Sequence, residues 1–342
     1  MTMAKRSYDL HVLNPSDCLE SWDAFVDSSP QGSVFCRSWW LRAVCGNSFQ
    51  ILTLKRAGET VAGLPLYFSR RWMFKTVSMP LLTQALGPLL APSNKTTYEG
   101  RLSEEMSILS ELVDAIPRCD LFHMRCHHNL TNWLPFFWAG YRQTTQYTYL
   151  IPDLTDLDKV FSEFAHSKRK NINKAEGLVE VHEDLPAEEF YANHLMTLEK
   201  QGERITYDFD VFKRIYDAAH RSRAAKTWYA LDAKNNIHAA ILVVFDRHSA
   251  YYLISTIDPG FRSSGAATLL VRDAISYVSK YTKRFDFEGS MIAGVEQSFR
   301  RFGAILTPYF SLHKDNRRLP MQLLGGAYTA YETILRKLGL RR

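Results

Sequence analysis

The chain has 342 residues, of which 46% are hydrophobic and 13% aromatic, and its formal net charge is +6. This composition supports packed cores and excludes an intrinsically disordered chain, while the length suggests two domains and the mild positive charge suits an anionic partner. The sequence shows neither an apolar run that could span a bilayer nor a signal-peptide pattern, so we expect a cytoplasmic protein.

The first half predicts two helices, a hairpin, an amphipathic helix and a closing unit of strand, helix and strand. Helices are predicted over residues 20–27 and 38–44, where apolar residues recur at helical spacing. In FQILTLKRAGETVAGLPLYFS (49–69) a polar turn joins two apolar strands. The helix over 104–116 and the segment 119–151 complete this half.

The second half follows a similar order. The predicted elements are helices over 155–164 and 167–176, a hairpin over 227–246, a strand over 251–256, a helix over 267–281, and a strand followed by a helix in FDFEGSMIAGVEQSFRRFGAIL (285–306). Gly140 and Gly303 fall at the same point of the two halves. The shared order predicts an internal duplication with its boundary near IPDLTD.

The motifs SKRKNINKAE, IDPGFRSSGAATLLVRDAI and FDFEGSMIAGVEQSFRRFGAIL resemble the FemAB-like branch of the GNAT acyltransferase superfamily. SPQGSVFCRSWWLRAV and GLPLYF resemble the first GNAT-like domain of the same proteins. The resemblance implies an α/β (α+β) fold of two tandem GNAT-like domains, each a mixed, mostly antiparallel sheet flanked by helices. Residues 1–152 would form the first domain, on the acceptor side or structural, and residues 153–320 the second domain, which carries the donor loop.

The resemblance implies a transferase that moves an aminoacyl or acyl group onto an acceptor amine, such as that of a cell-wall or envelope precursor. The donor would be aminoacyl-tRNA or acyl-CoA, no cofactor would be bound, and the acceptor could be nucleotide- or lipid-linked. Because the resemblance spans both domains, it favours the aminoacyl donor. Two alternatives remain: an acyl-CoA-dependent N-acyltransferase acting on an amino sugar, polysaccharide or lipid precursor, and a non-catalytic binding protein with the same fold.

A loop of small residues precedes the helix predicted over 267–281. Small residues at a strand-to-helix turn let backbone N–H groups approach an anion, and the helix dipole adds to the attraction. The spacing is similar to that of the GNAT loop that holds the pyrophosphate of coenzyme A. The predicted donor-binding residues are Arg262, Ser263, Ser264, Gly265, Ala266 and Ala267. A tight turn with a solvated arginine is the alternative.

A short helix with four cations is the second candidate. Cations so close together repel one another, which indicates an anionic ligand such as a diphosphate or an RNA backbone, although a solvated face is the simpler alternative. The predicted acceptor- or phosphate-binding residues are Lys168, Arg169, Lys170, Asn171, Lys174 and, on the strand over 251–256, Tyr251. Tyr252 and Ser255 of that strand are weaker candidates.

Asp286 and Glu288 alternate with two phenylalanines on a predicted strand, so both carboxylates should lie on the side away from the core. Amine attack on an ester or thioester needs a proton acceptor, and a carboxylate at a cleft can serve. They are therefore the predicted catalytic residues, and the alternative is a structural network with nearby arginines. Backbone N–H groups near residues 254–257 would hold the tetrahedral oxyanion.

Three further expectations concern features outside this site. The cysteines and histidines of CDLFHMRCHHNL lack the spacing of metal ligands, so no metal site is predicted. The first half has TQALGPLL in place of RSSGAA, so we expect that domain to bind acceptor or shape the cleft. Residues 321–342 predict an amphipathic, basic C-terminal helix that either packs on the protein or contacts an anionic membrane at its inner surface.

Overall fold

The computed structural model describes residues 8–289 and 291–317. In the first half the elements are β1 (Asp9–Leu13), α1 (Glu20–Ser28), η1 (Val34–Cys36), α2 (Ser38–Cys45), β2 (Phe49–Arg56), β3 (Glu59–Arg71), β4 (Phe74–Ser78), β5 (Leu89–Leu90), α3 (Tyr98–Ala115), β6 (Leu121–Arg125), α4 (Leu134–Trp138) and β7 (Arg142–Ile151). In the second half they are α5 (Leu157–Ser162), α6 (His166–Glu176), β8 (Glu180–Glu183), α7 (Ala187–Lys200), α8 (Phe209–Arg221), β9 (Ala225–Leu231), β10 (Ile237–Phe245), β11 (Ala250–Ile257), η2 (Pro259–Ser264), α9 (Ala266–Val278), β12 (Phe285–Asp286), α10 (Ala293–Arg300) and β13 (Ile305–Asp315).

One 13-stranded sheet runs through both halves. Its order is β1-β2-β3-β4-β6-β13-β7-β12-β11-β10-β9-β8, with β5 paired to β3 off this path. Neighbouring strands are antiparallel except for one parallel pair in each half, β4 with β6 and β11 with β12. A helix, α3 or α9, connects each parallel pair, as a crossover between parallel strands requires. The predicted mixed, mostly antiparallel α/β fold is confirmed.

The strand order reads the same from both edges, so the two halves are related by an approximate two-fold axis between β13 and β7. This arrangement agrees with the predicted duplication but corrects the pairing of the helices. The counterparts of α1 and α2 are α7 and α8, because each pair lies between an edge strand and a hairpin. The shared order of predicted elements had placed α5 and α6 opposite α1 and α2. In the structure α5 and α6 precede β8 and have no equivalent in the first half.

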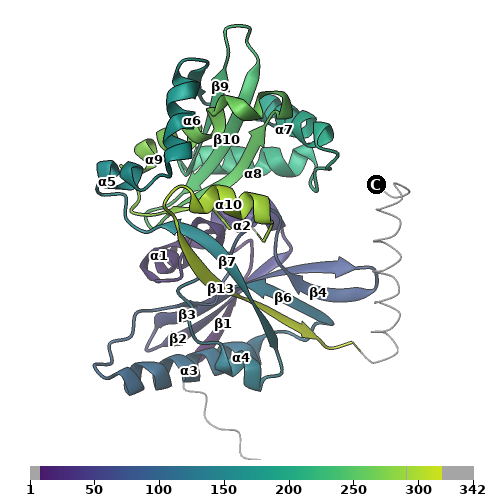
Figure 1. Ribbon diagram of the computed structural model, residues 1–342. Helices are drawn as coiled ribbons and strands as arrows, with labels where there is room; N and C mark the ends of the chain where they lie inside the picture. The colour runs from purple at the N-terminus through teal and green to yellow at the C-terminus, as the bar shows by residue number, and fades with distance from the viewer. Residues whose placement is uncertain (1–7, 290, 318–342) are drawn as a thin grey trace, which may run out of the picture.

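The last strand of each half pairs with the other half. Strand β13 lies between β6 and β7, with its register running from Ile305 opposite Leu150 to His313 opposite Arg142. Strand β7 in turn pairs with β12, where Phe285 lies opposite Ile151. Figure 1 shows these two long strands running between the upper, second half and the lower, first half. The sheet therefore continues across the predicted domain boundary near residue 152.

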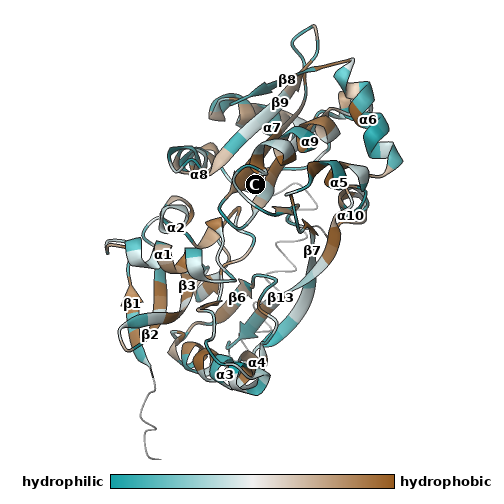
Figure 2. Ribbon diagram, turned by 90° about the vertical axis from the view of Figure 1, so that its left-hand side faces the viewer, coloured by the Kyte–Doolittle hydropathy of each residue, from teal (hydrophilic) through white to brown (hydrophobic). Residues whose placement is uncertain are grey.

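Helices cover the sheet on both faces and complete its cores. Helix α9 contributes Leu270, Ala274 and Ile275 to a core that also contains Phe285 and Phe287. On the opposite face, α2 packs beside its counterpart α8 around a core centred on Trp40 and Phe212. Figure 2 shows α9 as a largely apolar helix and α6 as a hydrophilic helix at the edge of the second half. Helix α6 therefore packs against the rest of the second half through only one of its faces.

Strands β11 and β12 separate shortly after they meet. Their parallel register contains only two pairs, Ala250 with Phe285 and Tyr251 with Asp286. Beyond this point β11 continues to Ile257, whereas the chain of β12 turns away toward α10. The result is an open gap between two central strands of the second half, next to the beginning of α9.

The predicted C-terminal helix over 321–342 lies outside the described residues. Among the helices within 8–289 and 291–317, none combines the length and the apolar character that crossing a bilayer requires.

Candidate functional site

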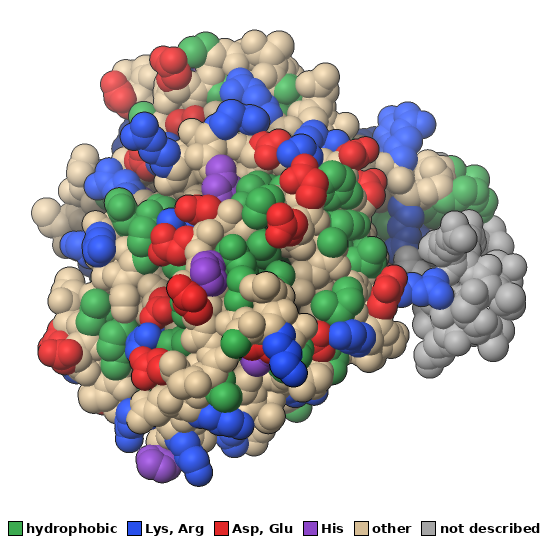
Figure 3. Space-filling model, turned by 90° about the horizontal axis from the view of Figure 1, so that it is seen from above, with side chains coloured by type: hydrophobic (Ala, Val, Ile, Leu, Met, Phe, Trp, Pro, Cys, Tyr) green, Lys and Arg blue, Asp and Glu red, His purple; other side chains and the backbone are tan. Residues whose placement is uncertain are grey.

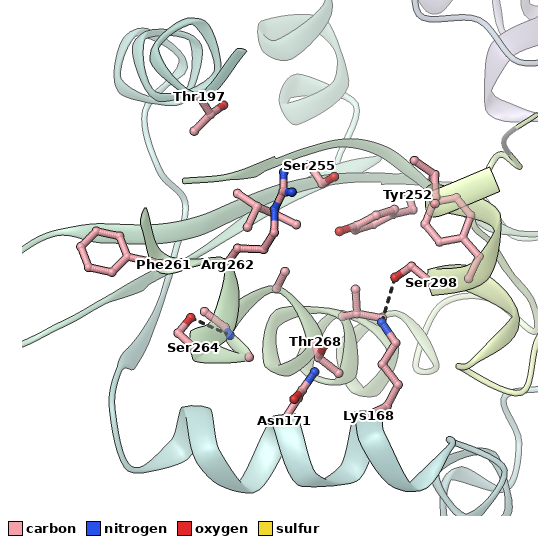
Figure 4. A pocket seen from close by; sticks show the side chains of 18 of the residues that line it. Lys168, Asn171, Thr197, Tyr252, Ser255, Phe261, Arg262, Ser264, Thr268 and Ser298 are labelled. Atoms are coloured by element: carbon pink, nitrogen blue, oxygen red, sulfur yellow. Dashed lines mark hydrogen bonds between the residues drawn. The ribbon is translucent and has the colours of Figure 1, made fainter. Parts of the chain in front are cut away.

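A cavity of about 600 Å³ lies in the second half, between α6, α7, α9, α10 and strand β11. Its walls come from segments far apart in the sequence, and 18 of the lining side chains are drawn in Figure 4. The lining residues that carry the argument below are Lys168, Asn171, Tyr252, Ser255, Arg262, Ser264, Gly265, Ala266, Ala267, Thr268 and Ser298.

The predicted donor loop forms one end of this cavity. Of its six residues, all but Ser263 line the cavity. The Ser264 hydroxyl accepts a hydrogen bond from the Ala266 amide at 3.2 Å, and Ala266 and Ala267 are the first two residues of α9. The positive end of the α9 dipole therefore faces the cavity, with the exposed Arg262 at its rim. This arrangement suits an anionic group.

Gly265 is required by packing rather than by a ligand. Its φ of +86° is in the left-handed region, which strains any side chain larger than hydrogen. A Cβ at this position would also lie 2.2 Å from the carbonyl oxygen of Asn171 on α6. The glycine therefore lets the donor loop pack directly against α6, which brings the two predicted segments together.

The cationic helix α6 contributes unequally to the cavity. Lys168 and Asn171 line it. Arg169 instead donates to the backbone carbonyls of Ser162 and Phe164. Lys170 is exposed, and Lys174 donates to the carbonyl of Ser263 at 2.7 Å, outside the cavity lining. Thus one cation of this helix reaches the cavity, and one holds the donor loop from outside.

Lys168 is a buried cation without a carboxylate partner among the described residues. Only 8% of the residue is exposed. Its Nζ donates to the Ser298 hydroxyl at 2.9 Å and lies 3.9 Å from the centroid of the Phe302 ring. Burial, aided by repulsion from Arg301, lowers the pKa of Lys168 to about 8. A lysine in this state is ready to bind an anion or to stabilise a developing negative charge.

Strand β11 supplies Tyr252 and Ser255, whereas Tyr251 faces away. The pairing of β10 with β11 skips Leu253, so β11 has one extra residue there. Because such a bulge shifts the alternation of faces, Tyr252, Ser255 and Ile257 all line the cavity. Tyr251 is buried on the opposite face, with its ring 4.8 Å from that of Phe35. The structure does not bring Tyr251 into this site.

The two predicted catalytic carboxylates lie on the opposite side of β12 from the cavity. Phe285 and Phe287 belong to the core beneath α9, as the alternation predicted. Asp286 is buried and accepts hydrogen bonds from the Thr148 hydroxyl, from Gln84 Nε2 at 3.3 Å and from the Glu288 amide at 2.7 Å. It lines a separate cavity of about 10 Å³, large enough for about one water molecule.

Burial dominates the electrostatics of this pair. It raises the pKa of Asp286 to about 6, against the opposing effect of the hydrogen bonds from Thr148 and Glu288. Burial and the neighbouring Asp286 charge raise the pKa of Glu288 well above its usual range, which attraction to Arg125 opposes. Glu288 also has a φ of +60°, unusual for a residue with a side chain. Burial therefore raises the pKa values of both carboxyl groups, on the side of β12 that faces away from the cavity.

Several lining residues were not predicted from the sequence. Thr268 of α9, Ser298 of α10 and Thr197 of α7 all line the cavity. Ser298 lies three residues after Val295 on α10, so the helical period places both on one face, and both line the cavity. This spacing is a signal from which Ser298 could have been predicted. Helix α7 carried no such motif, and only the fold brings it to this site.

The remaining predictions concern charge and metal. On the face drawn in Figure 3, basic and acidic side chains are interspersed, without one broad basic surface. The residues in 8–289 and 291–317 contain no cluster of three or more metal-ligating side chains. His123, for instance, stacks on His313 with ring centroids 4.6 Å apart.

Comparison with known proteins agrees with this architecture. Residues 160–295 match the family model of the acetyltransferase (GNAT) domain. The chain is similar in structure to FemX, with a TM-score of 0.65 and 14% identity over 88% of this chain and 96% of that chain. It is also similar to a tandem GNAT protein from the clavulanic acid biosynthesis pathway, with a TM-score of 0.54 and 13% identity over 91% of this chain and 99% of that one.

A third similar structure is that of L-PGS from Bacillus licheniformis, with a TM-score of 0.50 and 12% identity over 91% of this chain and 96% of that chain. No curated protein matches the chain in sequence. The family match lies on the half that contains the cavity, and the structural matches span both halves. Residues 160–295 therefore match a GNAT acetyltransferase domain, and the fold of the whole chain is similar to that of FemX and of the tandem GNAT protein.

Proposed function

We propose that the protein transfers an acyl group from an acyl-CoA thioester to the amine of an acceptor, with the donor bound in the cavity of the second half. The observation that carries the proposal is the position of the donor loop: it opens α9 at one end of a cavity of about 600 Å³. That volume lies in the range of small-molecule sites. The sequence alone favoured an aminoacyl donor, whereas the cavity beside the donor loop supports CoA.

The anionic part of the donor fits the end formed by the loop. Ser264, Ala266 and Ala267 place the beginning of α9 there, and Arg262 stands at the rim. Backbone amides and a helix dipole bind phosphate without a large side chain in the way. The Lys168 ammonium, farther along the same cavity, offers a second positive charge. A pyrophosphate at α9 would direct the remainder of the donor toward β11 and α10.

The acyl end fits the gap between β11 and β12. Tyr252 and Ser255 present hydroxyl groups there, and Val295 and Phe299 of α10 form an apolar wall. The acceptor nitrogen attacks the thioester carbon, the carbon–sulfur bond breaks, and the nitrogen loses a proton as CoA leaves with its sulfur. Backbone N–H groups of β11 near residues 254–257 are the proposed donors to the oxyanion.

Asp286 and Glu288 are the proposed proton acceptors, from the far side of the gap. Their raised pKa values bring them closer to the range in which a general base works best. The FemAB-like resemblance favours an amine of a cell-envelope precursor as acceptor. Its nucleotide or lipid linkage, a tRNA partner and a membrane contact through residues 321–342 stay predictions.

Binding of the donor should be visible as a thermal shift. We expect acetyl-CoA to raise the melting temperature of the purified protein, because a ligand that binds only the folded state stabilises it by mass action. Binding should weaken only modestly with salt. Aminoacyl-tRNA would instead bind with a steep salt dependence, because several phosphates release counterions together. A shift with charged tRNA and none with acetyl-CoA would replace the proposed donor by the aminoacyl one.

Lys168→Met is the matched variant for this measurement. The pKa of Lys168 is lowered from 10.5 to about 8, which means that burying its ammonium group lowers the free energy of unfolding by about 3 kcal/mol at pH 7. The variant should therefore melt above the wild type without ligand. It should also shift less with acetyl-CoA. Between pH about 8 and 10.5 the lysine is neutral in the folded protein but still protonated in the unfolded chain, so the free energy of unfolding of the wild type rises with pH. The difference in melting temperature between the variant and the wild type should shrink in that range.

A further inference from the structure

The first half has a second cavity, of about 580 Å³, at the position that corresponds to the donor cavity. It lies between the first turns of α3 and the segment before α4, just as the donor cavity lies between α9 and α10. Pro30 and Gln31, which follow α1, occupy the place that Gln201, after α7, takes in the second half. The approximate two-fold symmetry therefore repeats the cavity as well as the fold.

The features that suit an anion are missing from this copy. Helix α6 has no counterpart in the first half, so no wall corresponds to Lys168. The first turns of α3 carry Glu104 and Glu105 into the lining. The Arg101 guanidinium, also in the lining, donates to the carbonyls of Lys95 and Thr96. A pyrophosphate would meet carboxylates here, so the two cavities take different ligands.

The lining contains a buried asparagine, Asn132, and a half-buried glutamate, Glu105, that are incompletely hydrogen-bonded. Asn132 is 9% exposed; its Oδ1 accepts a hydrogen bond from the Leu134 amide at 3.1 Å, and its buried Nδ2 meets no acceptor at hydrogen-bonding geometry among the described residues. Glu105 makes no ion pair within the described ranges, whereas Glu104 is bound by Arg56 at 2.6 Å. Burial raises the pKa of Glu105, and an interaction with the Asn132 amide, which falls outside ordinary hydrogen-bond geometry, opposes this effect.

Aromatic and aliphatic side chains complete the lining. Tyr98 is 73% exposed at the rim, and Trp133 and Phe310 lie deeper with ring centroids 6.5 Å apart. Leu134, exposed at 43%, lies beside them. The cavity thus offers flat apolar surface next to one donor and one acceptor that have unused hydrogen-bonding capacity.

We propose that this first-half cavity binds a neutral saccharide unit, with hydroxyl groups on Asn132 and Glu105 and the apolar face of the sugar ring against Trp133. A hydroxyl both donates and accepts, so adjacent hydroxyls satisfy an amide N–H and a carboxylate together. Leaving the buried Asn132 amide N–H unpaired costs free energy, which a fitting ligand recovers. An alkylammonium ion would pair with Glu105 but would leave Asn132 Nδ2 without an acceptor.

The inference goes beyond the proposed acyl transfer and does not depend on the identity of the donor. The test uses the full-length protein with N-acetylglucosamine and glucose as probes and butylamine as the charged comparison, observed by saturation-transfer NMR. We expect transfer to at least one sugar. Asn132→Asp keeps the acceptor for the Leu134 amide but replaces the free N–H by a second carboxylate. It should weaken sugar binding about tenfold or more, and the response to acetyl-CoA reports whether the variant is folded.

Ala267→Asp in the donor cavity is the matched control, and it should leave sugar binding unchanged. Lost sugar binding in Asn132→Asp together with an unchanged response to acetyl-CoA supports a separate saccharide site. Binding of butylamine alone, no transfer to either sugar, or transfer that Asn132→Asp leaves intact would each overturn the proposal. A failure of CoA binding in the wild type would affect only the proposed donor.

Discussion

Replacing Ala267 by aspartate is expected to lower acyl transfer by about a hundredfold or more, because the new carboxylate would face the phosphates of the donor. Ala267 is the second residue of α9 and lines the donor cavity. A carboxylate at a helix N-terminus stabilises the helix by about 0.3–1 kcal/mol, so the fold should be retained or strengthened. The measurement is kcat/KM with acetyl-CoA, together with the melting temperature.

Ala267→Ser is the matched control, since it adds a polar atom of small size without charge and should stay near wild-type activity. A substitution at Gly265 would be less informative, because its Cβ would meet the Asn171 carbonyl at 2.2 Å and disturb the packing of α6. If Ala267→Asp binds CoA as tightly as the wild type, the beginning of α9 does not hold the donor phosphates.

Asp286→Asn is expected to lower kcat by about a hundredfold, the usual contribution of a positioned proton acceptor. A base must be ionised, so wild-type activity should fall as the pH drops through the pKa of Asp286, about 6. The variant should lack this fall. Glu288→Gln is the companion variant, because burial also raises the pKa of Glu288.

Folding can be separated from catalysis in the same variants. The pKa of Asp286 is about 6 in the folded protein against a usual value of 3.8, so the folded state binds the proton more tightly and wild-type stability should fall as the pH rises from about 4 to 6. Asp286→Asn should lack that fall and should keep a melting temperature close to that of the wild type at neutral pH. Full activity of both variants across pH would make the carboxylates a structural network.

The sequence predicted the tandem fold and the loop that begins α9, because both depend on local patterns. The hairpins and the helix after the loop showed clear periodicity. The pairing of equivalent helices was wrong because β8 is short and largely polar, with sequence EVHE, and gives no strand signal. Without β8 as a marker, α5 and α6 looked like the counterparts of α1 and α2.

Packing decides which of the predicted residues line the cavity. Lys168 and Arg169 are adjacent cations, and only the packing of α6 decides that the first enters the cavity while the second caps backbone carbonyls. Tyr251 and Tyr252 differ by one position, and the extra residue at Leu253 sets which of them meets Ser255 on the cavity side. A bulge and a helix face of this kind are set by tertiary contacts.

The exchange of β7 and β13 could not be predicted either, since an apolar closing strand can pair within its own half or across to the other. Its consequence for the site is direct. Strand β7 brings Thr148 to Asp286, and the loop before β5 brings Gln84 to the same carboxylate. The candidate base in the second half is therefore held in part by residues of the first half.

Hydrogen–deuterium exchange with and without CoA tests the central claim, that the second-half cavity is the donor site, most directly. We predict slower exchange of backbone amides in residues 262–271, which form the donor loop and the first turns of α9, when CoA is present. Residues 98–108 of α3, at the corresponding first-half cavity, should exchange at an unchanged rate. Protection at residues 98–108 with none at 262–271 would contradict the account.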